Sequence, residues 1–221
     1  MEALRIADYA TCKLEDNVIA RRVLAGEKEL FEILMRRYNQ TLYRVIRGYL
    51  KDEDEVQDTM QNAYLKAFDK LFQFRGDATF STWLIRIGIN EALLRLKDLK
   101  RKNLLSLNEV NVQIEAITIS DMQISPEKKL IRQESQKMLE HAIDSLPEKY
   151  RVVYILKEIE GFDNAHIAQV LGITDSNVKV RLHRAKALLK ESLYKLSSGV
   201  EVFEFGNSRC DAIVNFVMKA I

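Results

Sequence analysis

Apolar residues return every three or four positions along much of the chain, which is the spacing of α-helices that bury one face. One stripe of this kind runs through residues 27–50 and a second through residues 56–71. Acidic residues crowd positions 52–58, and negative charge is favourable at the start of a helix. These stretches predict two successive helices.

A loop and a third helix are predicted next. Gly76 interrupts the pattern within residues 73–79, and Thr79 or Ser81 can cap a helix that runs over residues 80–102. The three helices together predict a small N-terminal domain.

The helical pattern stops between residues 103 and 127, which carry four acidic residues and neither Lys nor Arg. Their β-branched residues would form at most an isolated strand, which is unstable without a partner, so we interpret the stretch as a linker. Helical spacing returns near Pro126 and continues to about Leu196, with Pro147 at a position that suits a helix start. The sequence thus predicts an all-α fold of two small helical domains joined by a flexible linker.

The C-terminal extension, residues 197–221, has a pattern compatible with a short strand and a short helix, and the sequence does not indicate its role. We interpret Cys210 in this extension as a small buried hydrophobe, with a redox sensor as the alternative.

The composition supports a globular helical protein. Hydrophobic residues make up 47% and charged residues 30% of the 221 residues, while 8 Gly and 2 Pro interrupt the chain. Cys12 and Cys210 are too far apart in the sequence to indicate a disulfide framework or a metal site. The first residues lack the order of a signal peptide, and no run of about 18 apolar residues is present. We therefore expect a cytoplasmic protein without direct membrane insertion.

The most specific local pattern lies within residues 164–183. A helix-turn-helix requires a small residue where its helices cross, a glycine in the turn and a buried β-branched residue on the second helix. Ala168, Gly172 and Val178 stand in that spacing, and Thr174 can cap the second helix. The pattern predicts a DNA-binding unit.

The second helix of this unit is predicted to be basic on its exposed side. Its cations can neutralise phosphates, and Arg can form paired hydrogen bonds with guanine. A solvated basic face is the alternative interpretation, which His183 alone would favour. The basic residues are Lys179, Arg181, His183, Arg184, Lys186 and Lys190.

Two separate blocks of sequence resemble one known family. The first block consists of residues 54–68, Phe74 with Arg75, and residues 80–90. The second consists of LPEKYRVVYILKEIEGF ahead of the helix-turn-helix and VKVRLHRAKALLK within it. In this order the blocks are similar to the extracytoplasmic-function (ECF) sigma factors of the sigma-70 family, over roughly residues 14–196. The resemblance implies a subunit that binds core RNA polymerase and promoter DNA and directs transcription initiation, with no catalytic residue, cofactor, metal or small-molecule substrate.

The resemblance also implies a division into domains. Sigma region 2, for polymerase docking and −10 recognition, would occupy residues 14–103, and the linker residues 104–133. Sigma region 4, for −35 recognition, would occupy residues 134–196, ahead of the extension at 197–221. In the family, the acidic helix of region 2 docks on a coiled coil of the largest polymerase subunit, whereas a solvated face is the alternative for that helix. The docking residues implied here are Asp54, Gln57, Asp58 and Gln61.

The loop and the third helix are implied to bind the −10 element, where the strands separate and a base leaves the stack. Stacking requires aromatic or planar groups, and the DNA backbone requires basic groups. For Phe80 and Trp83, burial in the core is the favoured alternative to base contact. The residues implied are Phe74, Arg75, Phe80, Trp83, Arg86, Asn90 and Arg95.

Region 4 is implied to read the −35 element as duplex DNA, with Arg181 facing phosphate and the other residues facing bases or the backbone. Val180 stands where the family often has a small hydroxyl, which predicts an apolar contact such as one to a thymine methyl. His166 stands where the family usually has a carboxylate, so a local helix contact is expected to differ. The residues implied are Lys179, Val180, Arg181, His183, Arg184 and Lys186. Many family members are restrained by an anti-sigma factor, and the sequence does not indicate whether this chain has such a partner.

Two other classes of protein explain less of the sequence. A stand-alone helix-turn-helix regulator would account for residues 137–196. It would not explain the acidic helix or the Phe-Ser-Thr-Trp block at residues 80–83. An enzyme would need a phosphate-binding glycine loop, a metal-ligand cluster or a nucleophile near a base, and the three histidines stand on separate predicted helices.

Overall fold

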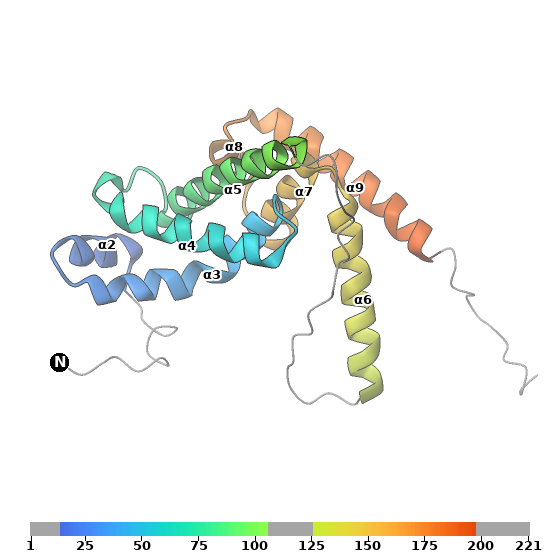
Figure 1. Cartoon of the computed structure of the whole chain (residues 1–221), viewed down its shortest axis with the longest axis horizontal. Helices are drawn as coiled ribbons and strands as arrows, with labels where there is room; N and C mark the ends of the chain where they lie inside the picture. Colours follow the sequence, from blue (N-terminus) through green and yellow to red (C-terminus); the bar gives the residue numbers. More distant parts are fainter. Residues whose placement is uncertain (1–13, 106–125, 198–221) are drawn as a thin grey trace, which may run out of the picture.

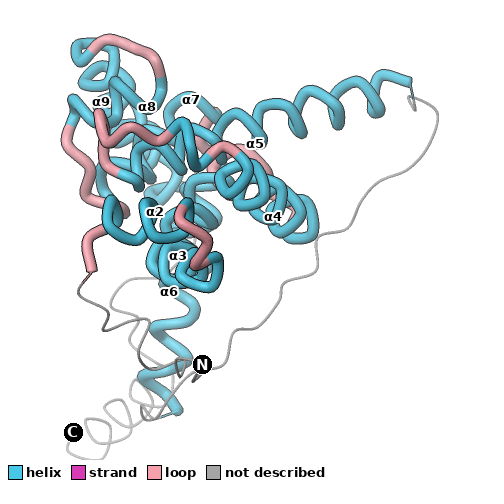
Figure 2. Tube along the Cα trace, turned by 90° about the vertical axis from the view of Figure 1, so that its left-hand side faces the viewer, coloured by secondary structure: helices cyan, strands magenta, loops and turns pink. Residues whose placement is uncertain are grey.

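The computed structural model describes residues 14–105 and 126–197, and this part of the chain consists of helices joined by turns and loops, without strands (Figures 1 and 2). The first set of elements is α2 (Asp16–Leu24), η1 (Lys28–Leu30), α3 (Phe31–Arg47), α4 (Glu53–Asp69), η2 (Leu71–Gln73) and α5 (Phe80–Leu105). The second set is α6 (Pro126–Ser145), α7 (Glu148–Tyr154), the π-helical turn η3 (Ile155–Ile159), α8 (Asn164–Leu171) and α9 (Asp175–Ser197). The all-α fold predicted from the sequence is therefore confirmed.

The N-terminal domain is built on α3, α4 and α5, which pack against one another. The stripes predicted from the sequence supply its core, in which Leu42, Val56 and Leu84 are fully buried. Gly88 allows α5 to approach α3, because a Cβ atom at this position would lie 2.5 Å from the Leu42 side chain. Thr79, rather than Ser81, caps α5, since its hydroxyl accepts a hydrogen bond of 3.2 Å from the Thr82 backbone N–H.

In the C-terminal domain, α6, α7 and α8 all pack against α9. Val178, near the start of α9, shares an apolar cluster with α8, whereas Ala185 and Leu189 share one with α6. Leu146, Leu156 and Ala185 are buried within this domain. Figure 1 shows the N-terminal part of α6 extending away from the body, and Figure 2 shows the C-terminal part of α5 doing the same.

The element boundaries differ from the predicted ones in detail. The helix predicted over residues 80–102 extends to Leu105, and residues 126–133, which we assigned to the linker, belong to α6. The predicted helix over residues 27–50 is divided into η1 and α3, which ends at Arg47. The rest of the linker after α5 and the strand and helix predicted for the extension lie outside the described residues.

The two domains pack directly on each other in this structure. Val45 of α3 and Ile85 and Ile89 of α5 share one apolar cluster with Ile167 and Val170 of α8. The helix-turn-helix therefore does not stand apart from the N-terminal domain.

Candidate functional site

The acidic face of α4 lies on a helix with a capped N-terminus. Asp52 caps it, because its carboxylate accepts a hydrogen bond of 3.0 Å from the Glu55 backbone N–H, and acidic residues fill the first turn. The helical spacing brings the predicted docking residues onto one side of α4, and all of them are exposed: Asp54, Gln57, Asp58 and Gln61.

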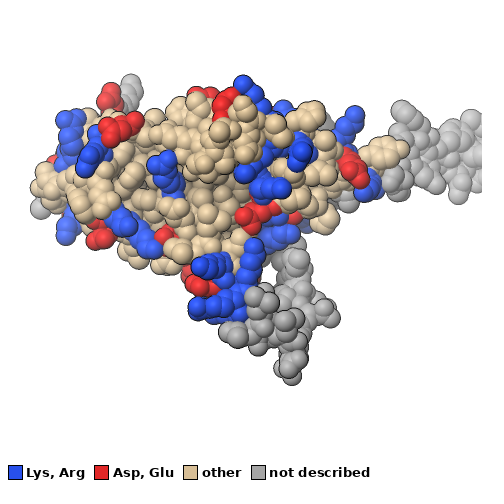
Figure 3. All heavy atoms as spheres, turned by 90° about the horizontal axis from the view of Figure 1, so that it is seen from above, with Lys and Arg blue, Asp and Glu red and all other residues tan. Residues whose placement is uncertain are grey.

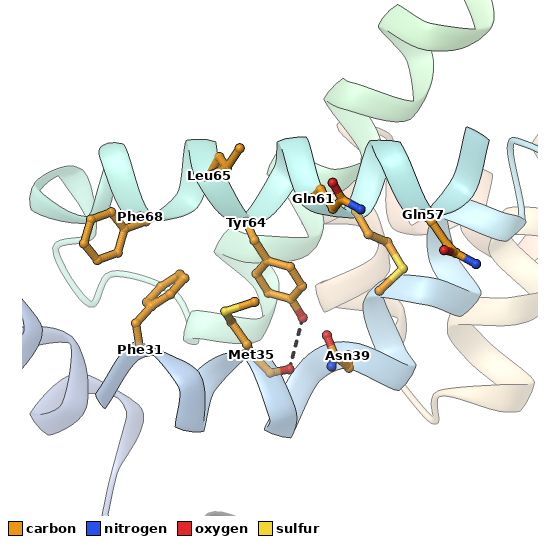
Figure 4. A pocket seen from close by; sticks show the side chains of 9 residues that line it. Phe31, Met35, Asn39, Gln57, Gln61, Tyr64, Leu65 and Phe68 are labelled. Carbon is orange, nitrogen blue, oxygen red and sulfur yellow. Dashed lines mark hydrogen bonds between the residues drawn. The ribbon is translucent and has the colours of Figure 1, made fainter. Parts of the chain in front are cut away.

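An apolar groove, which the sequence reasoning did not identify, borders this face. It has a volume of about 590 Å³ and lies between α3 and α4, as Figure 4 shows. Leu65 is 69% and Phe68 38% exposed, and they continue the row of Gln57 and Gln61 at a spacing of three and four. The groove is lined by Phe31, Met35, Asn39, Gln57, Met60, Gln61, Tyr64, Leu65 and Phe68.

The walls of the groove are fixed by direct contacts between the two helices. The Tyr64 hydroxyl donates a hydrogen bond of 3.1 Å to the Met35 carbonyl, and the rings of Phe31 and Phe68 meet edge to face at 5.2 Å. A preformed apolar groove beside acidic and amide side chains suits a helix of another protein that carries apolar and basic residues. The geometry of α3 and α4 thus describes a protein-docking surface.

The loop ahead of α5 is supported by an aromatic cluster. The rings of Phe74, Phe80 and Trp83 lie 5.5 to 5.6 Å apart, centre to centre. Phe80 is only 1% exposed, so its ring supports the loop from below and cannot stack on a base without leaving the core. Burial is the alternative that the sequence favoured for Phe80. Phe74 and Trp83 are half-buried, and Arg75 is exposed.

The remaining residues predicted for −10 binding lie along α5 in different environments. Asn90 is exposed, whereas Arg86 donates a hydrogen bond of 2.6 Å to the Gln169 carbonyl of α8. Arg95 forms two hydrogen bonds with Glu55 of α4, one of them 2.7 Å long, and this partner raises the pKa of its guanidinium. Arg95 therefore links α5 to α4.

The C-terminal end of α5 carries a concentrated positive charge. Figure 3 shows Lys and Arg side chains gathered on this face of the molecule, next to the atoms drawn in grey. Four exposed cations at the end of the helix contribute to it: Lys97, Lys100, Arg101 and Lys102. Such a group suits the phosphates of nucleic acid.

The helix-turn-helix has the packing that its sequence predicted. Gly172 adopts the left-handed conformation, with φ of 64°, in the turn between α8 and α9. Thr174 caps α9 by accepting a hydrogen bond of 3.2 Å from the Asn177 backbone N–H. Val178 is fully buried against Ile167, and Ala168 is half-buried where the helices meet.

The outer face of α9 is exposed and basic. Val180 is 51% exposed, and Lys179 forms an ion pair of 2.8 Å with Asp175 one turn earlier. Arg181 donates a hydrogen bond of 2.8 Å from its Nε atom to the Asn177 side chain, which fixes the direction of the guanidinium. His183 is exposed and adds a third polar group to this face.

Contacts with α7 and η3 position the rest of the basic face. Arg184 donates a hydrogen bond of 3.2 Å to the Tyr150 hydroxyl, and this contact lowers the pKa of Tyr150. Lys186 forms an ion pair of 2.9 Å with Glu158. Both cations remain exposed enough to exchange these partners for phosphate.

His166, at the start of α8, contacts the capping residue of that helix. The Asp163 carboxylate accepts a hydrogen bond of 2.7 Å from the His166 backbone N–H and lies 2.8 Å from the His166 Nδ1 atom. These hydrogen bonds lower the pKa of Asp163. His166 thus belongs to the cap of α8 at the protein surface.

None of the helices in the described ranges combines the length and the apolar character that a membrane crossing requires.

Comparison with known proteins matches both domains to one family. Residues 34–102 match Sigma-70 region 2, and residues 136–189 match Sigma-70 region 4. The RNA polymerase sigma-H factor of Pseudomonas aeruginosa is 31% identical over 185 residues, which cover 82% of this chain and 95% of that protein. The ECF RNA polymerase sigma-E factor of Escherichia coli K12 is 29% identical over 192 residues, which cover 83% of this chain and 97% of that factor.

A solved structure agrees with these relatives in fold. CnrH, determined in complex with the cytosolic domain of CnrY, is 26% identical to this chain and superposes with a TM-score of 0.55. The match covers 80% of this chain and 96% of CnrH. On the strength of both region matches and of relatives aligned over nearly their whole length, this chain belongs to the ECF sigma factors of the sigma-70 family.

Proposed function

We propose that this chain binds core RNA polymerase through α4 and directs the enzyme to promoters by reading the −10 element with α5 and the −35 element with α9. Family membership supports promoter-specific transcription initiation as its activity. The observation that carries the detailed proposal is the combination, in one chain, of the exposed docking face of α4 and the exposed basic face of a complete helix-turn-helix. Sigma factors act as regulatory subunits in initiation, so the chain changes where the polymerase starts and leaves RNA synthesis to the enzyme.

Docking on the polymerase uses the acidic row of α4 together with the apolar groove. Carboxylates give directional and long-range attraction to a basic partner, while the groove supplies the apolar contact that holds the complex. In the proposed docking surface, Leu65 and Phe68 therefore join the four predicted docking residues, which are Asp54, Gln57, Asp58 and Gln61. An isolated acidic face without the groove would bind only weakly at physiological salt.

Recognition of the −10 element uses the loop before α5 and the outer face of that helix. Phe74 and Trp83 present half-buried rings on which an unstacked base could rest. Arg75 of the same loop and Asn90 of α5 are exposed. The cations that end α5 neutralise phosphates next to the separated strands. In this proposal, the chain stabilises melted DNA by holding a base that has left the stack.

Recognition of the −35 element uses α9 in the major groove. Lys179, Val180, His183 and Arg184 face the base edges, Arg181 contacts phosphate, and Lys186 contributes to phosphate neutralisation. The hydrogen bond from Arg181 to Asn177 prepares the guanidinium for one fixed phosphate position. Val180 is proposed to favour a thymine methyl.

A protein partner that restrains the chain is also proposed. CnrH was solved with the cytosolic domain of CnrY, and an anti-sigma factor of this chain would compete with the polymerase for the groove between α3 and α4.

The proposed site of action is the cytoplasm, where RNA polymerase works.

Run-off transcription with core RNA polymerase tests the proposed function. Genomic fragments, including the one upstream of the gene for this chain, are transcribed with and without the purified protein. We expect new transcripts that require the protein and that are lost when Asp54 and Gln57 are both replaced by Ala. Both side chains are exposed, so the double variant is expected to fold like the wild type.

The runner-up is a stand-alone regulator that binds DNA without joining the polymerase. Binding of duplex DNA without any new transcript, and without co-elution with core polymerase, would refute the proposed function in favour of that regulator.

A further inference from the structure

Helix α6 carries an apolar stripe that is covered along only part of its length. Ala142 is fully buried, because it packs in one cluster with Ala185 and Leu189 of α9. One turn earlier, Met138 and Leu139 lie on the same side of α6, yet they are 38% and 42% exposed. The stripe therefore runs beyond the part that the described residues cover.

The last turns of α9 border this uncovered stripe. The Ser192 hydroxyl lies 3.1 Å from the Ser145 hydroxyl at the end of α6, and Leu193 is half-buried against the cluster that the two helices share. From this junction, the N-terminal part of α6 and the C-terminal part of α9 lead in different directions (Figure 1). The two helices therefore cannot cover each other along their whole length. We call the side chains of Met138, Leu139 and Leu193 the α6–α9 face.

The segment that follows α9 has a sequence pattern that fits such a face. The structure does not describe residues 198–221, but their sequence has apolar residues at the three-and-four spacing of a helix. Polar residues stand on the other side at a spacing of four, and these are Asp211, Asn215 and Lys219. The apolar residues are Ile213, Phe216, Val217, Ala220 and Ile221.

The segment is long enough to reach the α6–α9 face. Because Ser192 lies beside Ser145, Met138 is at most about 30 Å from the end of α9, at a rise of about 1.5 Å per helical residue. Residues 198–212 reach about 50 Å when extended. The Ser-Gly pair at residues 198–199 favours a turn directly after α9. The connection thus allows residues 213–221 to return to α6.

A segment of the same chain has an advantage over any separate molecule on this face. Its tether keeps it at an effective concentration in about the millimolar range, so a contact of a few apolar side chains is enough to keep it bound. Burial of those side chains against Met138 and Leu139 removes apolar surface of both from water. The neighbouring segment is therefore the occupant that the arrangement favours.

We propose that residues 213–221 pack as a helix on the α6–α9 face and complete the apolar core of the C-terminal domain. The extension thereby covers a surface that a helix of another protein must first uncover before it can bind there. This inference concerns the free chain and does not rest on the promoter elements that the chain reads.

The reactivity of a cysteine on the face tests the proposal in the full chain. Leu139→Cys is introduced after replacement of the native cysteines (Cys12→Ser, Cys210→Ser), and its reaction with a soluble maleimide is timed. Phe216→Asp should raise the rate at position 139 by at least about fivefold, because a charge on the apolar side releases the segment. Asn215→Asp is the matched control, since it adds the same charge on the polar side and should leave the rate unchanged.

Two further cysteine positions separate release of the segment from loss of the fold. Lys137→Cys lies on the opposite, exposed side of α6 and should react at one rate in all three backgrounds. Ala142→Cys lies beneath α9 and should stay unreactive in all of them, because position 142 is fully buried. The reactions are repeated over a range of protein concentrations and with core RNA polymerase added. We expect the rate in the free chain to be independent of its concentration.

Equal rates at position 139 in the three backgrounds would overturn the proposal. Equal increases at positions 139 and 142 in Phe216→Asp would also overturn it, because the segment would then support the fold of the whole domain instead of covering this face. A rate that falls as the protein concentration rises would assign the face to a second copy of the chain. Protection that is present only with core polymerase would assign it to the polymerase, and either assignment would contradict the proposal.

Discussion

At the scale of single residues, exposed apolar side chains distinguish a docking surface from a solvated helix. Leu65→Glu places a charge in the groove between α3 and α4 without disturbing the core, since Leu65 is 69% exposed. We expect affinity for core polymerase to fall by about tenfold or more, with the melting temperature unchanged. Leu24→Glu is the matched control, because Leu24 is 52% exposed and lies on α2 outside the groove. Equal affinities for both variants would contradict the role of the groove.

On α9, the residues proposed to choose the DNA sequence differ from those proposed to bind the DNA backbone. Arg181→Ala should weaken promoter binding by the polymerase complex at every −35 sequence and reduce the dependence of log K on log salt by about 1. Val180→Thr should change the preferred base at one position and leave that slope unaltered. Binding assays over a salt series on two −35 variants measure both effects. A change of base preference in Arg181→Ala would contradict its assignment to phosphate.

At the scale of elements, the turn of the helix-turn-helix depends on one backbone conformation. Gly172 has φ of 64° and open space around its Cα atom, so a side chain there is opposed by backbone strain alone. Gly172→Ala is expected to destabilise the protein by about 1–2 kcal/mol in urea denaturation. Gly172→Asn should cost less, because Asn tolerates this conformation. Equal stability of the wild type and Gly172→Ala would contradict the dependence of the turn on the left-handed conformation of residue 172.

Elements with strong local signals could be predicted from the sequence. The helix-turn-helix depends on Gly172, Thr174 and Val178, whose conformation, cap and burial follow from spacing within one short segment. The acidic face of α4 was also predictable, because exposed polar residues at helical spacing share a side. Neither prediction required knowledge of other parts of the chain.

The groove and the domain contact could not be predicted because both depend on how helices are placed. Phe68 belongs to the apolar stripe of α4, yet it is 38% exposed because α3 covers only part of that stripe. Likewise, spacing alone does not tell which of Leu84 and Ile85 faces the N-terminal core and which faces the other domain.

At the scale of the whole molecule, a charge exchange tests whether the domain contact exists in solution. Arg47→Asp and Asp144→Arg each place like charges opposite each other at a partly exposed pair, with both side chains 28% exposed in the wild type. Each single variant is expected to be more expanded in small-angle scattering, whereas the double variant should return to the compact form. The coupling energy should be about 1 kcal/mol. Identical scattering from all four proteins would contradict a contact made by this pair.

We propose that one chain reads two promoter elements at once on the polymerase. The most direct test of this proposal is run-off transcription from a promoter of this chain with five base pairs inserted between the −35 and −10 elements. The insertion turns one element by about half a helical turn relative to the other. We expect the transcript to be lost and a ten-base-pair insertion not to rescue it fully, because the polymerase fixes the spacing. Transcription that is unchanged by the five-base-pair insertion would contradict simultaneous reading by α5 and α9.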